Sequence, residues 1–291
     1  MWGNKCRENA RLALLLCPLP LTSPYMKRFI PFLNSDPRVA VIRLQGAIAA
    51  GARGGISDAT FAPVIEKAFA KGKPVAVALV INSPGGSPVQ SALVAARIRR
   101  LAVEKNVKVH AFVEDVAASG GYWLACAADD IWVDPSSIVG SIGVISASFG
   151  FVEAMGKLGV ERRVHTAGED KSILDPFRPE RAQDVERLKD LQREIHDAFM
   201  THVKARRGDR LADDPQLFTG AFWTGAKGIE LGLADGIGHL VPKLKELYGD
   251  KVRFAPYGPK KPLIPRLGAQ VLADLNQSVE ERALYARYGL N

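Results

Sequence analysis

Short apolar runs alternate with longer amphipathic stretches through much of this chain. Residues 39–44 and 75–81 are almost continuously apolar and rich in β-branched side chains, which is typical of strands buried on both faces. Residues 57–70 and 88–104 instead repeat their apolar side chains at helical spacing. Strands that alternate with helices of this length predict right-handed βαβ units and a mainly parallel sheet.

The same alternation continues toward the C-terminus. It predicts strands and helices in turn, with strands at residues 107–113, 130–133 and 162–165 and helices at residues 117–128, 151–158 and 179–206. The last of these helices places Pro179 in its first turn, and its apolar stripe consists of Leu188, Leu191, Ile195, Phe199 and Val203. Two short helices are expected within residues 222–247, and a basic amphipathic tail at residues 267–288.

The composition is that of a globular protein. The chain has 291 residues, of which 47% are hydrophobic and 24% charged, so it can bury a full core. We divide it into an N-terminal basic and apolar segment (residues 1–37), a main domain (residues 38–250) and a basic C-terminal extension (residues 251–291).

The net charge of +8 is concentrated at the two ends of the chain. Residues 1–43 carry an excess of five positive charges and residues 251–291 an excess of four, so the part between them is close to neutral. Basic tails are more typical of solvated or membrane-facing segments than of nucleic-acid readers, and no nucleic-acid partner is expected. The apolar run at residues 12–16 is too short to cross a bilayer, which takes about 20 apolar residues. Residues 1–25 therefore form a stunted signal sequence or precede a true start at Met26.

Ser119 is the first candidate for chemistry. It lies between a predicted strand and a predicted helix, flanked only by alanine and glycine. Such a turn can expose a hydroxyl with backbone N–H groups close by, which is the geometry that a nucleophile needs. A second glycine turn, residues 82–87, ends the apolar strand upstream and is a candidate oxyanion cradle.

A serine hydroxyl needs a base within hydrogen-bond reach. No histidine follows Ser119 until His165, which leaves lysine as the next candidate, and Lys171 stands alone downstream. Holding a lysine neutral near pH 7 requires a shift of roughly 3 pKa units, near 4 kcal/mol, which burial in a dry pocket can supply. Ser141 is the natural hydroxyl to orient it. The five histidines and three cysteines show no metal-like clustering, so no metal and no cofactor are expected.

Four features in this order resemble the signal peptide peptidase A (SppA/SohB) family of serine–lysine proteases. They are Asn82-Ser-Pro-Gly-Gly86, Ala117-Ala-Ser-Gly-Gly-Tyr122, Gly140-Ser-Ile-Gly-Val144 and the isolated Lys171. The segment 225–235 is similar to the family's closing helix motif, and the resemblance covers roughly residues 38–245. It implies the α/β fold of Clp protease and crotonase, a spiral of repeated β-β-α and βαβ units with a mainly parallel sheet.

The resemblance also implies a role for each site residue. Ser119 would be the nucleophile, Lys171 the general base, and Ser141 the group that orients the lysine. The N–H groups of Gly86 and Gly120 would bind the oxyanion. Gly85 would shape that turn.

Partners and location follow from the same resemblance. Members of the family degrade signal-peptide remnants and other unfolded hydrophobic peptides. Their single-domain forms assemble into homo-oligomeric rings, in which serine and lysine come from neighbouring subunits. The implied location is the bacterial cytoplasm or the surface of the inner membrane, because family members bound to membranes carry an anchor and this chain shows no full transmembrane span. Ala221 and Gly228 depart from what the family commonly shows near the closing helix.

Two other functions stay open from the residues alone. A crotonase-type acyl-CoA enzyme would also use glycine N–H groups as an oxyanion hole, but it would need acids in the pocket and no activated serine. A non-catalytic scaffold would bind hydrophobic peptides at a membrane surface without cleaving them.

Overall fold

The computed structural model describes residues 36–51, 55–168, 170–259 and 281–290. The chain divides into two units, Met1–Asp36 and Pro37–Asn291, and every described helix and strand belongs to the second. The proposed N-terminal segment (residues 1–37) lies almost wholly outside the described residues, as does most of the amphipathic tail. Within the described part of the chain, no helix is both long enough and apolar enough to cross a membrane.

Eight strands among the described residues form one sheet. Their order is β6-β5-β3-β2-β1-β8, with β4 paired to β3 and β7 paired to β4. Every pair is parallel except β5 with β6. The strands are β1 (Arg38–Gln45), β2 (Ala76–Ser83), β3 (Lys108–Ala118), β4 (Asp130–Val133), β5 (Ile138–Gly140), β6 (Phe222–Thr224), β7 (Gly236–Ile237) and β8 (Arg253–Tyr257). This arrangement confirms the α/β class and the mainly parallel sheet.

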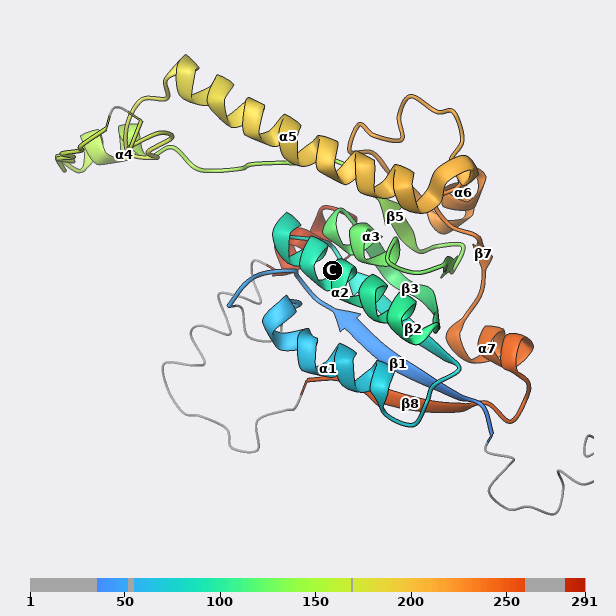
Figure 1. Cartoon of the computed structure of the whole chain (residues 1–291). Helices are drawn as coiled ribbons and strands as arrows, with labels where there is room; N and C mark the ends of the chain where they lie inside the picture. The colour runs from blue at the N-terminus through green and yellow to red at the C-terminus, as the bar shows by residue number, and fades with distance from the viewer. Residues whose placement is uncertain (1–35, 52–54, 169, 260–280, 291) are drawn as a thin grey trace, which may run out of the picture. The chain divides into compact units, whose positions relative to one another are not determined.

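Helices cover both faces of this sheet. Figure 1 shows α1, α2 and α3 along one face. The helices are α1 (Asp58–Ala70), α2 (Pro88–Lys105), α3 (Gly120–Ala125), α4 (Val152–Lys157), α5 (Ala182–Arg207), α6 (Gly225–Glu230) and α7 (Leu240–Tyr248). Val77 and Leu79 of β2 belong to the main core under α1–α3, whereas Ala76 and Ala78 pack on the other face with Leu244 of α7. Because neighbouring strand residues point to opposite faces, burial of both faces explains the continuous apolar run at residues 75–81.

Local capping places the two turns that matter for the site. Ser57 caps α1, and Ser87 caps α2 with Pro88 in its first turn. The glycine turn therefore lies between the carboxyl end of β2 and the start of α2. Ser119 lies in the same way between β3 and α3. In a parallel sheet the carboxyl ends of neighbouring strands meet at one edge, so these two turns lie next to each other.

Some sequence predictions differ from the structure. No strand forms at residues 162–165, so that prediction is wrong; those residues lie on an exposed segment with no neighbouring strand to pair with. The helix predicted from residue 117 begins only at Gly120, because Ala117 and Ala118 pair with β5 as the end of β3. The long helix starts at Ala182, which leaves Pro179 outside it. Strand β8 pairs with β1 and extends the sheet into residues that the sequence assigned to the C-terminal extension.

Residues 144–198, which we call the arm, contrast with the packed sheet and helices. The arm contains α4, the segment up to α5, and the first part of α5. Of the seventeen large hydrophobic side chains that are exposed among the described residues, nine belong to it: Ile145, Phe149, Phe151, Val152, Leu158, Val160, Phe177, Leu191 and Ile195. A backbone bond from Phe151 N to Pro176 O joins α4 to the segment before α5, and Figure 1 shows both at the outer end of α5.

Candidate active site

Ser119 occupies a strained turn between β3 and α3. Its backbone has φ +51° and ψ −122°, a conformation that L-residues other than glycine rarely adopt. Two backbone bonds hold it there: Ser119 N–H donates to Gly140 O at 2.9 Å, and Ser119 O accepts from Trp123 N at 3.0 Å. The residue is partly exposed, and its hydroxyl bonds to no other residue in the described part of the chain. The turn thus presents a free hydroxyl on a rigid support, as nucleophile turns at strand–helix junctions do.

The glycine turn lies directly against Ser119. A Cβ on Gly85 would lie 2.8 Å from both Ala118 O and Ser119 Cβ, so a larger residue would collide with the nucleophile turn. A Cβ on Gly86 would lie 2.2 Å from Ile48 O. Both glycines also have positive φ, +100° and +141°. Glycine is therefore required here for close backbone approach as well as for backbone freedom.

Two backbone N–H groups beside the hydroxyl have no acceptor among the described residues. Two backbone hydrogen bonds connect the glycine turn to Ile48: Ile48 N–H donates to Gly85 O, and Ser87 N–H donates to Ile48 O. Neither bond uses the N–H of Gly86. Gly120 is the first residue of α3, where an N–H has no acceptor within the helix. A Cβ added to Gly120 would lie 3.4 Å from Gly86 N, so the backbones of Gly86 and Gly120 lie side by side. The pair is arranged as an oxyanion hole is arranged.

Serine side chains support this turn in ways that the sequence did not single out. The hydroxyl of Ser83 donates to Gly46 O at 2.7 Å and lies 3.3 Å from Gly85 N. The hydroxyl of Ser91 donates to Ser87 O at 2.9 Å. Ser83 lies inside the quoted motif, but nothing in its one-dimensional context shows which carbonyl it reaches.

Ser141 lies next to Ser119 through the paired strands β3 and β5. It is 8% exposed, has φ +54°, and donates its N–H to Ala221 O at 2.7 Å. Its hydroxyl lies 3.3 Å from the hydroxyl of Tyr288, at the far end of the chain. The structure therefore brings Ser119, Ser141 and the glycine turns to one end of the sheet, as the resemblance implies.

Lys171 is not part of this group within one chain. It lies in a turn of the arm and is exposed, and no hydrogen bond joins it to Ser119 or Ser141 among the described residues. The dry surroundings expected for a lysine base are absent there. Its role stays a prediction.

The histidines and Cys126 are the other side chains that could act as a base or nucleophile, and none of them bonds to Ser119 among the described residues. Each histidine contacts a group other than Ser119 or is exposed: His110 bonds Asp130 and Tyr248, His196 and His202 bond backbone carbonyls, His239 pairs with Asp134, and His165 is exposed. Burial raises the pKa of the Cys126 thiol to about 12, so this thiol stays protonated and inert behind α3. Its assignment to the core is confirmed.

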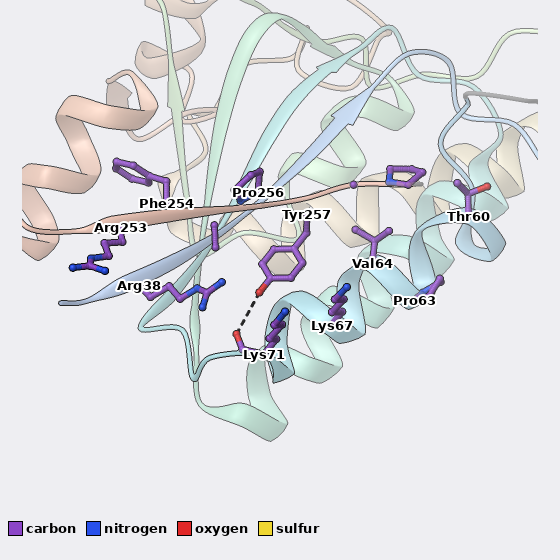
Figure 2. Close-up of a pocket in the computed structure, with 13 residues that line it drawn as sticks. Arg38, Thr60, Pro63, Val64, Lys67, Lys71, Arg253, Phe254, Pro256 and Tyr257 are labelled. Carbon is purple, nitrogen blue, oxygen red and sulfur yellow. Dashed lines mark hydrogen bonds between the residues drawn. The ribbon is translucent and has the colours of Figure 1, made fainter. Parts of the chain in front are cut away.

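A cavity in the described part of the chain lies away from these groups. It has a volume of about 890 Å³ and lies between α1 and the edge strand β8. Figure 2 shows Lys67 of α1 and Lys71, the residue after α1, below the ring of Tyr257, with Arg38 of β1 to their left. None of the residues assigned to catalysis lines this cavity, so it is separate from the candidate active site.

Comparisons with known proteins bear on the family. The family model "Peptidase family S49" matches residues 102–249. A Synechocystis protein named "Putative protease slr0021" is 30% identical over 244 residues, which cover 81% of this chain and 85% of that protein. A Haemophilus influenzae protein named "Probable protease SohB" is 32% identical over 198 residues, covering 67% of this chain and 54% of that protein.

A longer relative and a solved structure complete the comparison. A Brucella abortus protein named "Na(+)/H(+) antiporter NhaA" is 52% identical over 286 residues, and the match covers 91% of this chain but 39% of that protein. The chain thus spans well under half of that relative, whose name describes a longer protein. A structure of the 1510-N membrane-bound stomatin-specific protease, a mutant in complex with a substrate peptide, aligns with a TM-score of 0.49 at 13% identity, over 83% of this chain and 99% of that one.

The family model spans half of the sequence and includes the turns of Ser119 and Ser141. The match to the Synechocystis relative runs over most of both proteins. With the SohB and SppA relatives, these matches confirm the resemblance drawn from the motifs. The chain belongs to peptidase family S49.

Proposed function

We propose that this chain is a serine endopeptidase that acts through an acyl-enzyme, with Ser119 as its nucleophile. The observation that carries the proposal is the strained Ser119 turn, whose free hydroxyl lies beside the unused N–H groups of Gly86 and Gly120. Ser119 Oγ attacks the scissile carbonyl carbon, and the two N–H groups stabilise the oxyanion that forms. The leaving amine takes the proton removed from Ser119. Water then attacks the ester carbon, one of its protons returns through the base to Ser119 Oγ, and the second product leaves as a carboxylic acid.

The general base is Lys171 of a neighbouring copy of the chain. Two observations support this arrangement: Lys171 is exposed and has no hydrogen bond to Ser119 among the described residues of its own chain, and it lies on the arm, which carries nine exposed hydrophobic side chains. An apolar surface of this extent is typical of a protein–protein interface. Packing of the arm against a second copy would remove Lys171 from water and bring it to a foreign Ser119. A homo-oligomeric ring with shared active sites fits this requirement.

The substrates are unfolded hydrophobic peptides, such as the remnants of signal peptides. The support is the family, together with an open and partly exposed nucleophile turn that an extended backbone can reach. We place the enzyme in the bacterial cytoplasm or at the surface of the inner membrane.

Subunit mixing tests the shared site directly. Ser119→Ala and Lys171→Ala are each expected to lower the cleavage rate of a fluorogenic hydrophobic peptide by roughly 10³-fold or more. After the two purified variants are mixed and exchange subunits, about a quarter of the sites would again hold both groups, and the rate should recover to that level. Full activity of either single variant would disprove the mechanism. Inactive variants without recovery on mixing would place the lysine in the same chain as the serine.

A fluorophosphonate probe separates this proposal from the two alternatives. The probe should label the wild-type chain at Ser119 and leave the Ser119→Ala chain unlabelled. An acyl-CoA enzyme or a peptide-binding scaffold would show no such labelling.

A further inference from the structure

The last residues of the chain pack next to the candidate active site. Residues 281–286 are helical, and Tyr288 follows in a turn and is 7% exposed. Tyr288 forms a small apolar cluster with Val116 and Ala118 of β3, and its ring meets Phe222 of β6 edge-on at 5.1 Å. Strand β3 leads directly into Ser119, and Phe222 pairs with Gly140, the residue before Ser141. The C-terminal segment therefore supports the same end of the sheet that carries the chemistry.

Two tyrosine hydroxyls connect this segment to both functional turns. Tyr285 donates to Asn82 O at 2.8 Å, and Tyr288 lies 3.3 Å from Pro84 O, so both reach carbonyls of the glycine turn. The Tyr288 hydroxyl is also 3.3 Å from Ser141 Oγ. A phenol has one proton to donate and lone pairs that accept. It can therefore donate to Pro84 O while accepting the proton of the Ser141 hydroxyl.

In that orientation of the Tyr288 hydroxyl, Ser141 is the donor of the bond between the two hydroxyls. When Ser141 donates to Tyr288, its oxygen lone pairs are left to accept from another donor. An amine N–H is such a donor, and accepting from it would turn the lone pair of the amine toward Ser119. The same tyrosine holds Pro84, directly before the glycines of the oxyanion turn.

Inhibition by covering the site is the competing interpretation, and the exposures argue against it. With the C-terminal segment in place, Ser119 remains partly exposed and Gly86 remains exposed. No hydrogen bond joins Tyr285 or Tyr288 to Ser119 among the described residues. The segment lies beside the nucleophile rather than over it.

We propose that Tyr288 is a positioning residue of the peptidase site, acting on the reaction through Ser141. This inference rests on the proposed function, because Ser141 has a task only if a lysine serves as base. Tyr285 strengthens the same attachment by holding the glycine turn at Asn82. The C-terminal segment is in this view part of the catalytic apparatus.

A double-mutant cycle in the full chain tests the proposal. Tyr288→Phe keeps the ring and removes the hydroxyl. It should lower kcat about tenfold, with KM changed less than about twofold, since positioning acts on the chemical step. Ser141→Ala alone should lower kcat as well. In the Ser141→Ala background, Tyr288→Phe should cause no further loss, because its effect passes through that hydroxyl.

Tyr257→Phe is the matched control. Its hydroxyl also bonds a backbone carbonyl, Lys71 O at 3.4 Å, but it lies in the separate cavity shown in Figure 2. This variant should keep wild-type kcat, and thermal unfolding should show all variants folded. Wild-type kcat in Tyr288→Phe, an increase in kcat, or an effect that adds fully to that of Ser141→Ala would each overturn the inference. Fluorophosphonate labelling of Ser119 in the same preparations shows whether the proposed function still stands in that case.

Discussion

The two halves of α5 carry one continuous apolar stripe but have different surroundings. In the C-terminal half, Phe199 and Val203 are buried, and the Phe199 ring stacks on Trp123 of α3 at 4.9 Å. In the N-terminal half, which belongs to the arm, Leu191 is 46% exposed and Ile195 is 37% exposed. Periodicity alone treats the five stripe residues as equivalent. Among the described residues, the structure shows one end of the stripe covered by the chain and the other end exposed.

This difference parallels the two roles that we propose for Ser119 and Lys171. The end of α5 that packs on α3 supports the helix that begins directly after Ser119, so the described residues of one chain hold Ser119 in place. The arm holds Lys171 and leaves its apolar side chains uncovered. The packed end of α5 is covered within the described residues, whereas the arm would become buried against the neighbouring copy that we propose.

Ion pairs at the two ends of α5 should give the largest contrast in stability. Arg207 is buried and pairs with Asp235 at 2.7 and 3.1 Å, whereas the Asp190–Arg193 pair lies on the arm with both side chains more than half exposed. Asp235→Ala leaves a buried guanidinium without its main partner and should lower the free energy of unfolding by about 3–5 kcal/mol. Asp190→Ala should lower it by about 0.5 kcal/mol or less.

Urea unfolding followed by circular dichroism measures both values. If Asp190→Ala were as damaging as Asp235→Ala, the exposed half of α5 would be packed against its own chain. The proposed division between the two halves would then be wrong.

Charges placed at the exposed apolar residues of α5 should weaken assembly without changing the stability of the monomer. The double variant Leu191→Glu, Ile195→Glu should keep the wild-type unfolding midpoint of the monomer, because neither side chain is buried. It should give an assembly of fewer subunits, because charges buried at an interface oppose association. Peptidase activity should fall about tenfold or more as the shared sites are lost. Native mass spectrometry and a peptide cleavage assay give the two readouts.

Val103→Glu is the control for this variant. Val103 is 73% exposed on α2, outside the arm, so a charge there should change neither mass nor activity. An unchanged mass in the Leu191→Glu, Ile195→Glu variant would show that the stripe is not an interface.

The sequence predicts the buried region of this fold well and the rest less well. Continuous apolar runs identify β1 and β2, since strands covered on both faces leave little freedom in composition. The short strands β5, β6 and β7 have only two or three residues and carry too few positions for a periodic pattern. The strand expected at residues 162–165 has no neighbouring strand in the described part of the chain, and pairing cannot be read from propensity alone.

The site shows the same limit. The motifs locate Ser119 and its glycines because close backbone approach permits few residue types there. Tyr288 escapes such a search: it contacts Ser141 across 147 positions of sequence, and a tyrosine in a basic tail carries no local signal. The surroundings of Lys171 cannot be derived from one chain at all if a second copy provides them.

Acid should give the smallest of the expected effects, and it acts on the packed end of α5. Burial raises the pKa of Asp235. The hydrogen bond and charge of Arg207 lower this pKa, as does the hydrogen bond from Ile131 N–H, and together they outweigh burial, so the pKa lies below its usual value. A carboxylate with a lowered folded pKa stabilises the protein fully above its unfolded pKa of about 3.9 and loses that contribution as the pH falls through the folded value. The excess stability of wild type over Asp235→Asn should therefore be constant above about pH 5 and shrink progressively below it. Other acids with lowered pKa values, such as Asp58 and Asp184, are present in both proteins and cancel in this difference.

Urea midpoints measured from pH 6 to pH 3 test this expectation. An excess stability that stays constant over the whole range would show that the ionised carboxylate is not what holds Arg207.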